Sequence, residues 1–87
     1  MFQNHLIKKI KGFKYLPEGW ANGSGGPISE KVINHALVIA QMGKDVDAFP
    51  GEDDEILLTF YSMVGLDSVD ILIKSDLTLE IEFDKNS

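Results

Sequence analysis

The residues that decide the fold are 77–84, which read LTLEIEFD. Every second side chain in this stretch is apolar, and those between are polar or charged. Because side chains alternate between the two faces of a strand, this period of two predicts a strand with one face on a core and the other in water. One-sided burial of this kind is typical of antiparallel sheets.

Strand-like segments separated by turn residues also precede this stretch. They predict three further strands, at residues 46–50, 55–62 and 69–74. A turn at residues 51–54, a looser connection over 63–68 and a tight turn at 75–76 join consecutive strands. Strands joined by such short connections pair antiparallel, so the sequence predicts a β-meander of about four strands.

Residues 29–42 instead carry apolar side chains at the helical period, so they predict the main helix. The Ser29 hydroxyl is expected to accept a hydrogen bond from an early helical N–H, and Ile28 and Ile33 occupy the two positions of a hydrophobic staple. Gly43 suits a left-handed helix end. The predicted fold class is therefore α+β, with this helix packed on one face of the antiparallel meander.

The predicted core combines one stripe of the helix with the inward face of the sheet. Its members are Ile33, Leu37, Leu58, Phe60, Ile71, Ile81 and Phe83.

Composition indicates a single domain. The chain has 87 residues and no cysteine, which excludes disulfides and thiolate zinc sites and favours a reducing, cytoplasmic setting. No apolar run approaches the ~20 residues that span a bilayer, and the first residues lack the features of a secretory signal. We expect a basic amphipathic segment at 1–15 and one α+β domain at 16–87.

The charge is unevenly distributed. The net charge is -6, yet the first fifteen residues contain four lysines and no acid. Residues 2–14 have helical apolar spacing, which predicts a short amphipathic helix. This basic segment either packs on the acidic body, which we favour, or reaches an anionic partner such as a membrane surface. The acidic body itself repels phosphate backbones, so it is not expected to bind nucleic acid.

Residues 16–27 are rich in glycine and proline and predict a loop that is long for so small a domain. Trp20 lies in its middle. Because a large aromatic side chain is costly to leave in water, we favour an indole that anchors the loop on the body. The alternative is an exposed indole that serves as a contact for a partner.

Residues capable of catalysis or metal binding are few. His5 and His35 have no carboxylate or serine partner at a motif spacing, and the glycine-rich loop lacks the lysine of a phosphate loop. The acidic residues at 52–55, with Asp47, offer oxygen ligands for a hard cation, but their spacing is not that of a calcium loop, and we favour a solvated hairpin tip. We assign no catalytic, cofactor or metal residue.

Three segments resemble a family of small uncharacterised bacterial proteins. They are LPEGW at 16–20, PIS at 27–29 and DAFPGEDDEILLTFY at 47–61, and the resemblance extends over about residues 16–83. The family pattern is close to LPxGW…GxGxPxS…DAFPGxDGEIxLTFY, followed by a β-hairpin. The resemblance implies a fold and a bacterial origin but no activity. Asp54 replaces the family's turn glycine, and relatives often continue further, so one edge of the domain is expected to be uncovered.

These observations favour a non-enzymatic protein-interaction module, such as an antitoxin- or immunity-like partner of a neighbouring gene product. The alternative is a small-ligand or metal-binding protein or enzyme that uses the Trp20 loop and the acidic hairpin. A sheet edge is the expected adhesive surface and a homodimer the expected state, because outer strands carry unpaired backbone groups. The residues expected at a contact surface are Trp20, Glu52, Asp53, Asp54, Tyr61, Glu80 and Glu82.

Overall fold

The computed structural model describes residues 4–61 and 66–85. Its elements are, in chain order, α1 (Asn4–Gly12), the 3-10 helix η1 (Phe13–Tyr15), α2 (Glu30–Ala40), β1 (Val46–Gly51), β2 (Glu55–Tyr61), β3 (Leu66–Ile73) and β4 (Leu79–Lys85). The strands form one sheet in the order β1-β2-β3-β4, and all neighbours are antiparallel. The predicted α+β fold with an antiparallel meander is therefore confirmed.

Two predicted boundaries differ from the structure at β3 and β4. β3 already begins at Leu66, within the expected connection over 63–68, whose residues 63–65 lie outside the described part. Leu77 belongs to the turn before β4, since its φ is 70° and its N–H donates to the Lys74 carbonyl at 2.8 Å. A left-handed residue that closes a three-residue hairpin loop replaces the expected two-residue turn.

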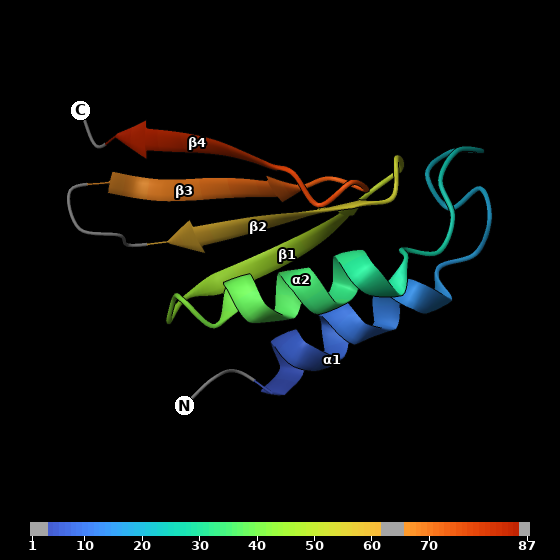
Figure 1. Ribbon diagram of the computed structural model, residues 1–87, viewed down its shortest axis with the longest axis horizontal. Helices are drawn as coiled ribbons and strands as arrows, with labels where there is room; N and C mark the ends of the chain where they lie inside the picture. Colours follow the sequence, from blue (N-terminus) through green and yellow to red (C-terminus); the bar gives the residue numbers. More distant parts are fainter. Residues whose placement is uncertain (1–3, 62–65, 86–87) are drawn as a thin grey trace.

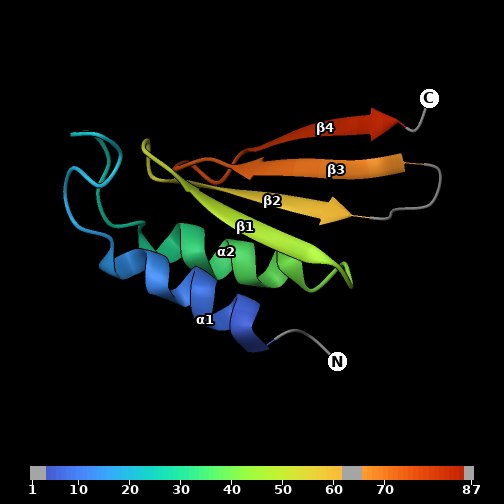
Figure 2. The ribbon, with the colours of Figure 1, turned by 180° about the vertical axis from the view of Figure 1, so that it is seen from behind.

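Both helices pack on one face of the sheet, as Figures 1 and 2 show, and they lie nearest to β1 and β2. α1 contributes Leu6 and Ile10 to the same buried cluster that contains the inward residues of the sheet. The basic N-terminal helix therefore packs on the body, which was the favoured interpretation of its apolar stripe.

The predicted core is correct for one part of the sheet and wrong for another. Ile33, Leu58 and Phe60 are buried, and Leu37 and Ile71 are partly buried against the same cluster. Ile81 and Phe83 are exposed, so their assignment to the core is wrong. Both point to the face that carries the helices, because they pair with Ile71 and Val69 of β3. The helices cover β1, β2 and part of β3 on this face of the sheet. They do not reach β4, so its side chains on the same face are exposed.

The N-terminus of α2 is held by a residue distant in sequence. Ser29 is its N-cap residue, as predicted, but its hydroxyl makes no capping hydrogen bond. Instead, Oδ1 of Asp54 accepts a hydrogen bond from the Ser29 N–H at 2.6 Å. Asp54 lies in the β1–β2 turn with a φ of 56°, a conformation that Asp tolerates better than most residues. The Ser29 hydroxyl is buried and has no partner among the described residues.

We expect Asp54→Gly to lower the free energy of unfolding by about 1–2 kcal/mol. Glycine preserves the left-handed turn but removes an ionised hydrogen-bond acceptor from a partly buried backbone N–H. Ser29→Ala is the control, and we expect it to be neutral or slightly stabilising, because the hydroxyl that it removes is buried without a partner. Urea titrations of both variants measure the difference. A larger loss for Ser29→Ala than for Asp54→Gly would contradict this account.

Gly43 does not adopt the left-handed conformation predicted for it, since positive φ among the described glycines is confined to Gly19, Gly23 and Gly25. α2 ends at Ala40, and the cap residue Gln41 keeps helical angles. A β-carbon on Gly43 would collide with the ring of Phe60. The glycine is therefore needed for close packing rather than for its backbone angles.

Candidate functional site

An exposed apolar strip runs along β4. We use the name β4 strip for Leu79, Ile81 and Phe83, whose side chains are 41, 50 and 65% exposed. All three lie on the core face of the sheet, as their pairing with Ile73, Ile71 and Val69 of β3 requires. The core face of the sheet is therefore exposed to solvent at β4, one of its two edge strands. Contiguous exposed apolar side chains of this kind often mark interaction surfaces.

A small apolar groove adjoins the β4 strip. It has a volume of about 120 Å³ and is lined by Met42, Phe60, Val69 and Ile71. Met42, just beyond α2, is largely exposed. Since Val69 and Ile71 are the direct neighbours of Phe83 and Ile81 across the β3–β4 pairing, the groove and the strip form one continuous apolar surface.

The opposite face of β4 is acidic. Glu80 and Glu82 are exposed there and line a groove of about 270 Å³ together with Asp70, Leu57 and Leu72. Lys74 Nζ lies 3.3 Å from Glu80 Oε2, and both side chains are well exposed. Among the described residues Glu82 forms no ion pair, and Asp70 is directly opposite it on β3. β4 therefore has an apolar face and a negatively charged face.

The residues predicted for a contact surface do not form one site. Trp20 is half-buried, and its Nε1 donates to the Gly26 carbonyl at 2.9 Å. The indole therefore holds its own loop closed, and it is half-buried rather than free in solvent. A β-carbon on Gly25 would lie 2.8 Å from Trp20 Nε1 and 3.4 Å from Cα of Glu52, so the loop rests beside the β1–β2 turn.

The other predicted contact residues are divided between different surroundings. Glu52 and Asp53 are exposed on the turn, whereas the Asp54 carboxylate is engaged at the α2 N-terminus. Tyr61 is exposed at the last residue of β2. Glu80 and Glu82 lie on β4, so they alone of the predicted set adjoin the β4 strip.

The N-terminal lysines contact the body of the domain. Lys9 Nζ donates to Asp47 Oδ1 at 2.8 Å and lies 5.0 Å from the centroid of the Phe49 ring. This ion pair lowers the pKa of the Asp47 carboxyl, so its stabilising effect is present at neutral pH and is lost as acid protonates Asp47. Both side chains are about two-fifths exposed, so we expect a contribution of at most about 1 kcal/mol.

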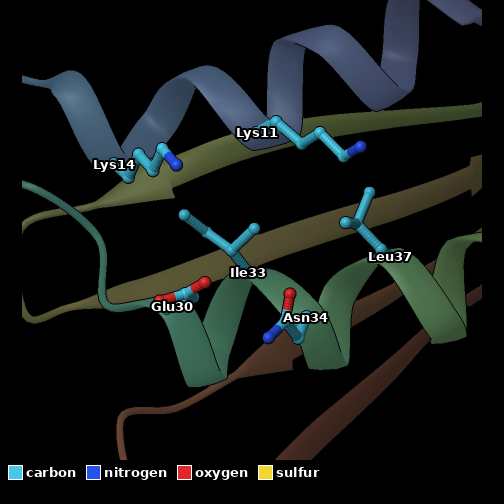
Figure 3. Close-up of a pocket in the computed structure, with 6 residues that line it drawn as sticks. All are labelled: Lys11, Lys14, Glu30, Ile33, Asn34 and Leu37. Carbon is cyan, nitrogen blue, oxygen red and sulfur yellow. The ribbon is translucent and has the colours of Figure 1, made fainter.

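Two further lysines line a groove between the helices, shown in Figure 3. Lys11 and Lys14 stand on one side, and Glu30 lies on the other with Asn34 of α2. Ile33 and Leu37 complete the lining of this groove, whose volume is about 210 Å³. The mixed charges give it no strong preference for an anion or a cation.

The carboxyl of Glu55 is in an unfavourable position for its charge. Burial raises its pKa above the ordinary value of 4.5, and the negative charge of Asp53 raises it further. Because the folded state binds this proton more tightly than the unfolded chain, stability falls as pH rises through the interval between the two pKa values. Ionisation of Glu55 therefore weakens the fold at neutral pH.

We expect Glu55→Gln to raise the melting temperature slightly at pH 7, since the amide removes this unfavourable ionisation while keeping the shape. The gain should disappear well below pH 4.5, where the glutamate is protonated in both states. Melting curves of both proteins at a series of pH values test this sign. A gain that persists unchanged in acid would contradict it, as would a loss at pH 7.

No group of three or more His, Asp or Glu side chains in residues 4–61 and 66–85 is arranged to hold a metal ion. The three grooves above are each smaller than the ~300 Å³ at which ligand pockets begin. His5 is exposed and His35 half-buried, and neither has a described hydrogen-bond partner. None of the described helices combines the length and apolarity needed to cross a membrane.

Comparison with known proteins adds no relative. No protein-family model, curated protein or solved structure matches the chain. The resemblance of residues 16–83 to a small bacterial family therefore stays a prediction, and the function has to be argued from the surfaces themselves.

The sequence pattern identified two of the acids on β4 but placed Ile81 and Phe83 in the core. Alternation shows that Leu79, Ile81 and Phe83 share a face, but not whether a helix reaches that part of the face. One available signal was the width of the main helix. A single helix about 10–12 Å wide cannot cover four strands spaced about 4.8 Å apart.

Proposed function

We propose that the protein is a non-enzymatic protein-interaction module that binds a partner through β4. One observation carries the proposal: Leu79, Ile81 and Phe83 of β4 are 41, 50 and 65% exposed on the core face of an edge strand. A surface of this kind combines apolar side chains with backbone groups that can pair with another strand.

The apolar area is sufficient to matter energetically. Full burial of one large apolar side chain contributes about 1.5–3 kcal/mol, so covering the exposed parts of Leu79, Ile81 and Phe83 offers a few kcal/mol. The adjoining groove at Met42 and Ile71 enlarges the surface that a partner can cover. This favourable contribution supports binding of a protein segment.

Two kinds of partner can bind at β4 under this proposal, a different protein and a second copy of the chain. A different protein corresponds to the product of a neighbouring gene, in an antitoxin- or immunity-like arrangement in a bacterium, and a second copy gives a homodimer. A cytoplasmic location belongs to the proposal and is supported by the absence of cysteine. Catalysis is not part of it.

We expect Ile81→Lys to abolish partner binding while changing the free energy of unfolding by less than about 1 kcal/mol, since half of this side chain is already in water. Tyr15→Lys is the matched control, because it places the same charge at an exposed apolar residue of η1. Affinity purification from the native cell, with the stoichiometry of any complex measured, compares the three proteins. Light scattering at micromolar concentration detects self-association.

A stoichiometric complex that forms equally well with the Ile81→Lys variant would show that β4 is not the binding surface. A monomeric wild-type chain that recovers no partner at all would count against the interaction function as a whole.

A further inference from the structure

We infer that β4 receives an added partner strand in which apolar residues alternate with lysine or arginine. This inference rests on the proposed function and specifies the chemistry of the partner. β4 is the last strand of the sheet, with β3 on one side and no described strand on the other. An extended peptide can therefore continue the sheet by backbone hydrogen bonds, which is a common mode of peptide recognition.

The two faces of β4 determine which side chains such a strand should carry. Directly opposite residues of paired strands project to the same face. One set of partner residues would meet the β4 strip, and the intervening set would meet Glu80 and Glu82. Apolar residues fit the first set, because they would cover the exposed parts of Leu79, Ile81 and Phe83. Basic residues fit the second, because opposite charges across a strand pair attract and like charges repel.

The same reasoning disfavours a second copy of β4. Two identical antiparallel strands in one sheet are related by a twofold axis perpendicular to the sheet, so equivalent faces coincide. Glu80 and Glu82 of one copy would then face the same acids of the other, with Asp70 on the adjacent strand adding further negative charge. Lys74 relieves this repulsion only beside Glu80.

A labelled heptapeptide in which lysine alternates with valine tests the inference by fluorescence anisotropy. We expect saturable binding at low ionic strength. A peptide with glutamate in place of lysine should bind about tenfold more weakly. A lysine peptide with N-methyl groups on alternate amides, which blocks one hydrogen-bonding edge, should not bind, because charge alone would not replace strand pairing.

Charge reversal on the protein provides the second measurement. Glu82→Lys should weaken binding of the lysine peptide and strengthen binding of the glutamate peptide, each by about tenfold. Asp45→Lys is the matched control, because it makes the same charge change at an exposed residue next to β1, at the other end of the strand order. We expect it to leave the ratio of the two affinities unchanged.

Equal binding of the lysine and glutamate peptides would overturn the inference, as would undiminished binding of the N-methylated peptide or no binding of any peptide. A wild-type homodimer that Ile81→Lys disrupts would also overturn it, since the edge would then belong to a second copy. That last result would leave the proposed function intact, whereas a native complex unaffected by Ile81→Lys would refute the proposed function itself.

Discussion

Phe60→Ala should lower the free energy of unfolding by about 3–5 kcal/mol. The Phe60 ring is only 3% exposed and packs in the buried cluster between the helices and the sheet. Its truncation removes buried apolar area and leaves a cavity that the rigid surroundings fill only in part. Since small domains have a total stability of about 5–15 kcal/mol, this loss removes a large fraction of it and should lower the melting temperature clearly. Urea titration followed by circular dichroism measures the change.

Phe83→Ala is the matched control for this prediction. It makes the same chemical change on the same face of the sheet, but 65% of the Phe83 side chain is already in water. We expect a loss below about 1 kcal/mol, because little buried area is removed. Similar losses for the two variants would mean that the core extends over β4 after all, in conflict with the exposed β4 strip.

Gly43→Ala should destabilise the fold by about 1–3 kcal/mol, although alanine is normally the better residue in a chain with ordinary backbone angles. A β-carbon at this position would collide with Cδ2 of Phe60 and lie 3.0 Å from Cγ2 of Val46. Both neighbours belong to the buried cluster and cannot move away without disturbing it. Thermal unfolding monitored by circular dichroism measures the loss.

Two comparisons make this result specific to packing. Gly12→Ala, at the last residue of α1, should stabilise the protein by about 0.4–1 kcal/mol, because a β-carbon there meets nothing within 4 Å. In a Phe60→Leu background the cost of Gly43→Ala should shrink, since the colliding ring is absent. If Gly43→Ala lowers the stability of the Phe60→Leu variant as much as that of the wild type, the contact with Phe60 is not the cause of the loss.

Local patterns predicted the elements because each depends on residues close together in the sequence. The alternation in residues 77–84 and the helical stripe in 29–42 correspond to β4 and α2, with ends displaced by a few residues. Short turns between strands led correctly to the antiparallel order. Glu80 and Glu82 were also placed correctly, exposed on the face of their strand that points away from the helices.

The candidate site was predicted only in part, because it depends on the fact that neither helix packs over the apolar side chains of β4. Ile81 and Phe60 have the same kind of position in an alternating strand, yet one is half-exposed and the other is buried. The difference arises from where the helices lie across the sheet, which no pattern within a strand records.

By itself, then, the sequence determined the secondary structure, the direction of strand pairing and the two chemically different faces of β4, since these depend on spacing along the chain. Tertiary structure alone decided three further features. The carboxylate of Asp54 caps α2 at Ser29, Gly43 makes room for Phe60, and the β4 strip stays open to solvent. Each of these depends on contact, or lack of contact, between segments that only folding brings to their places.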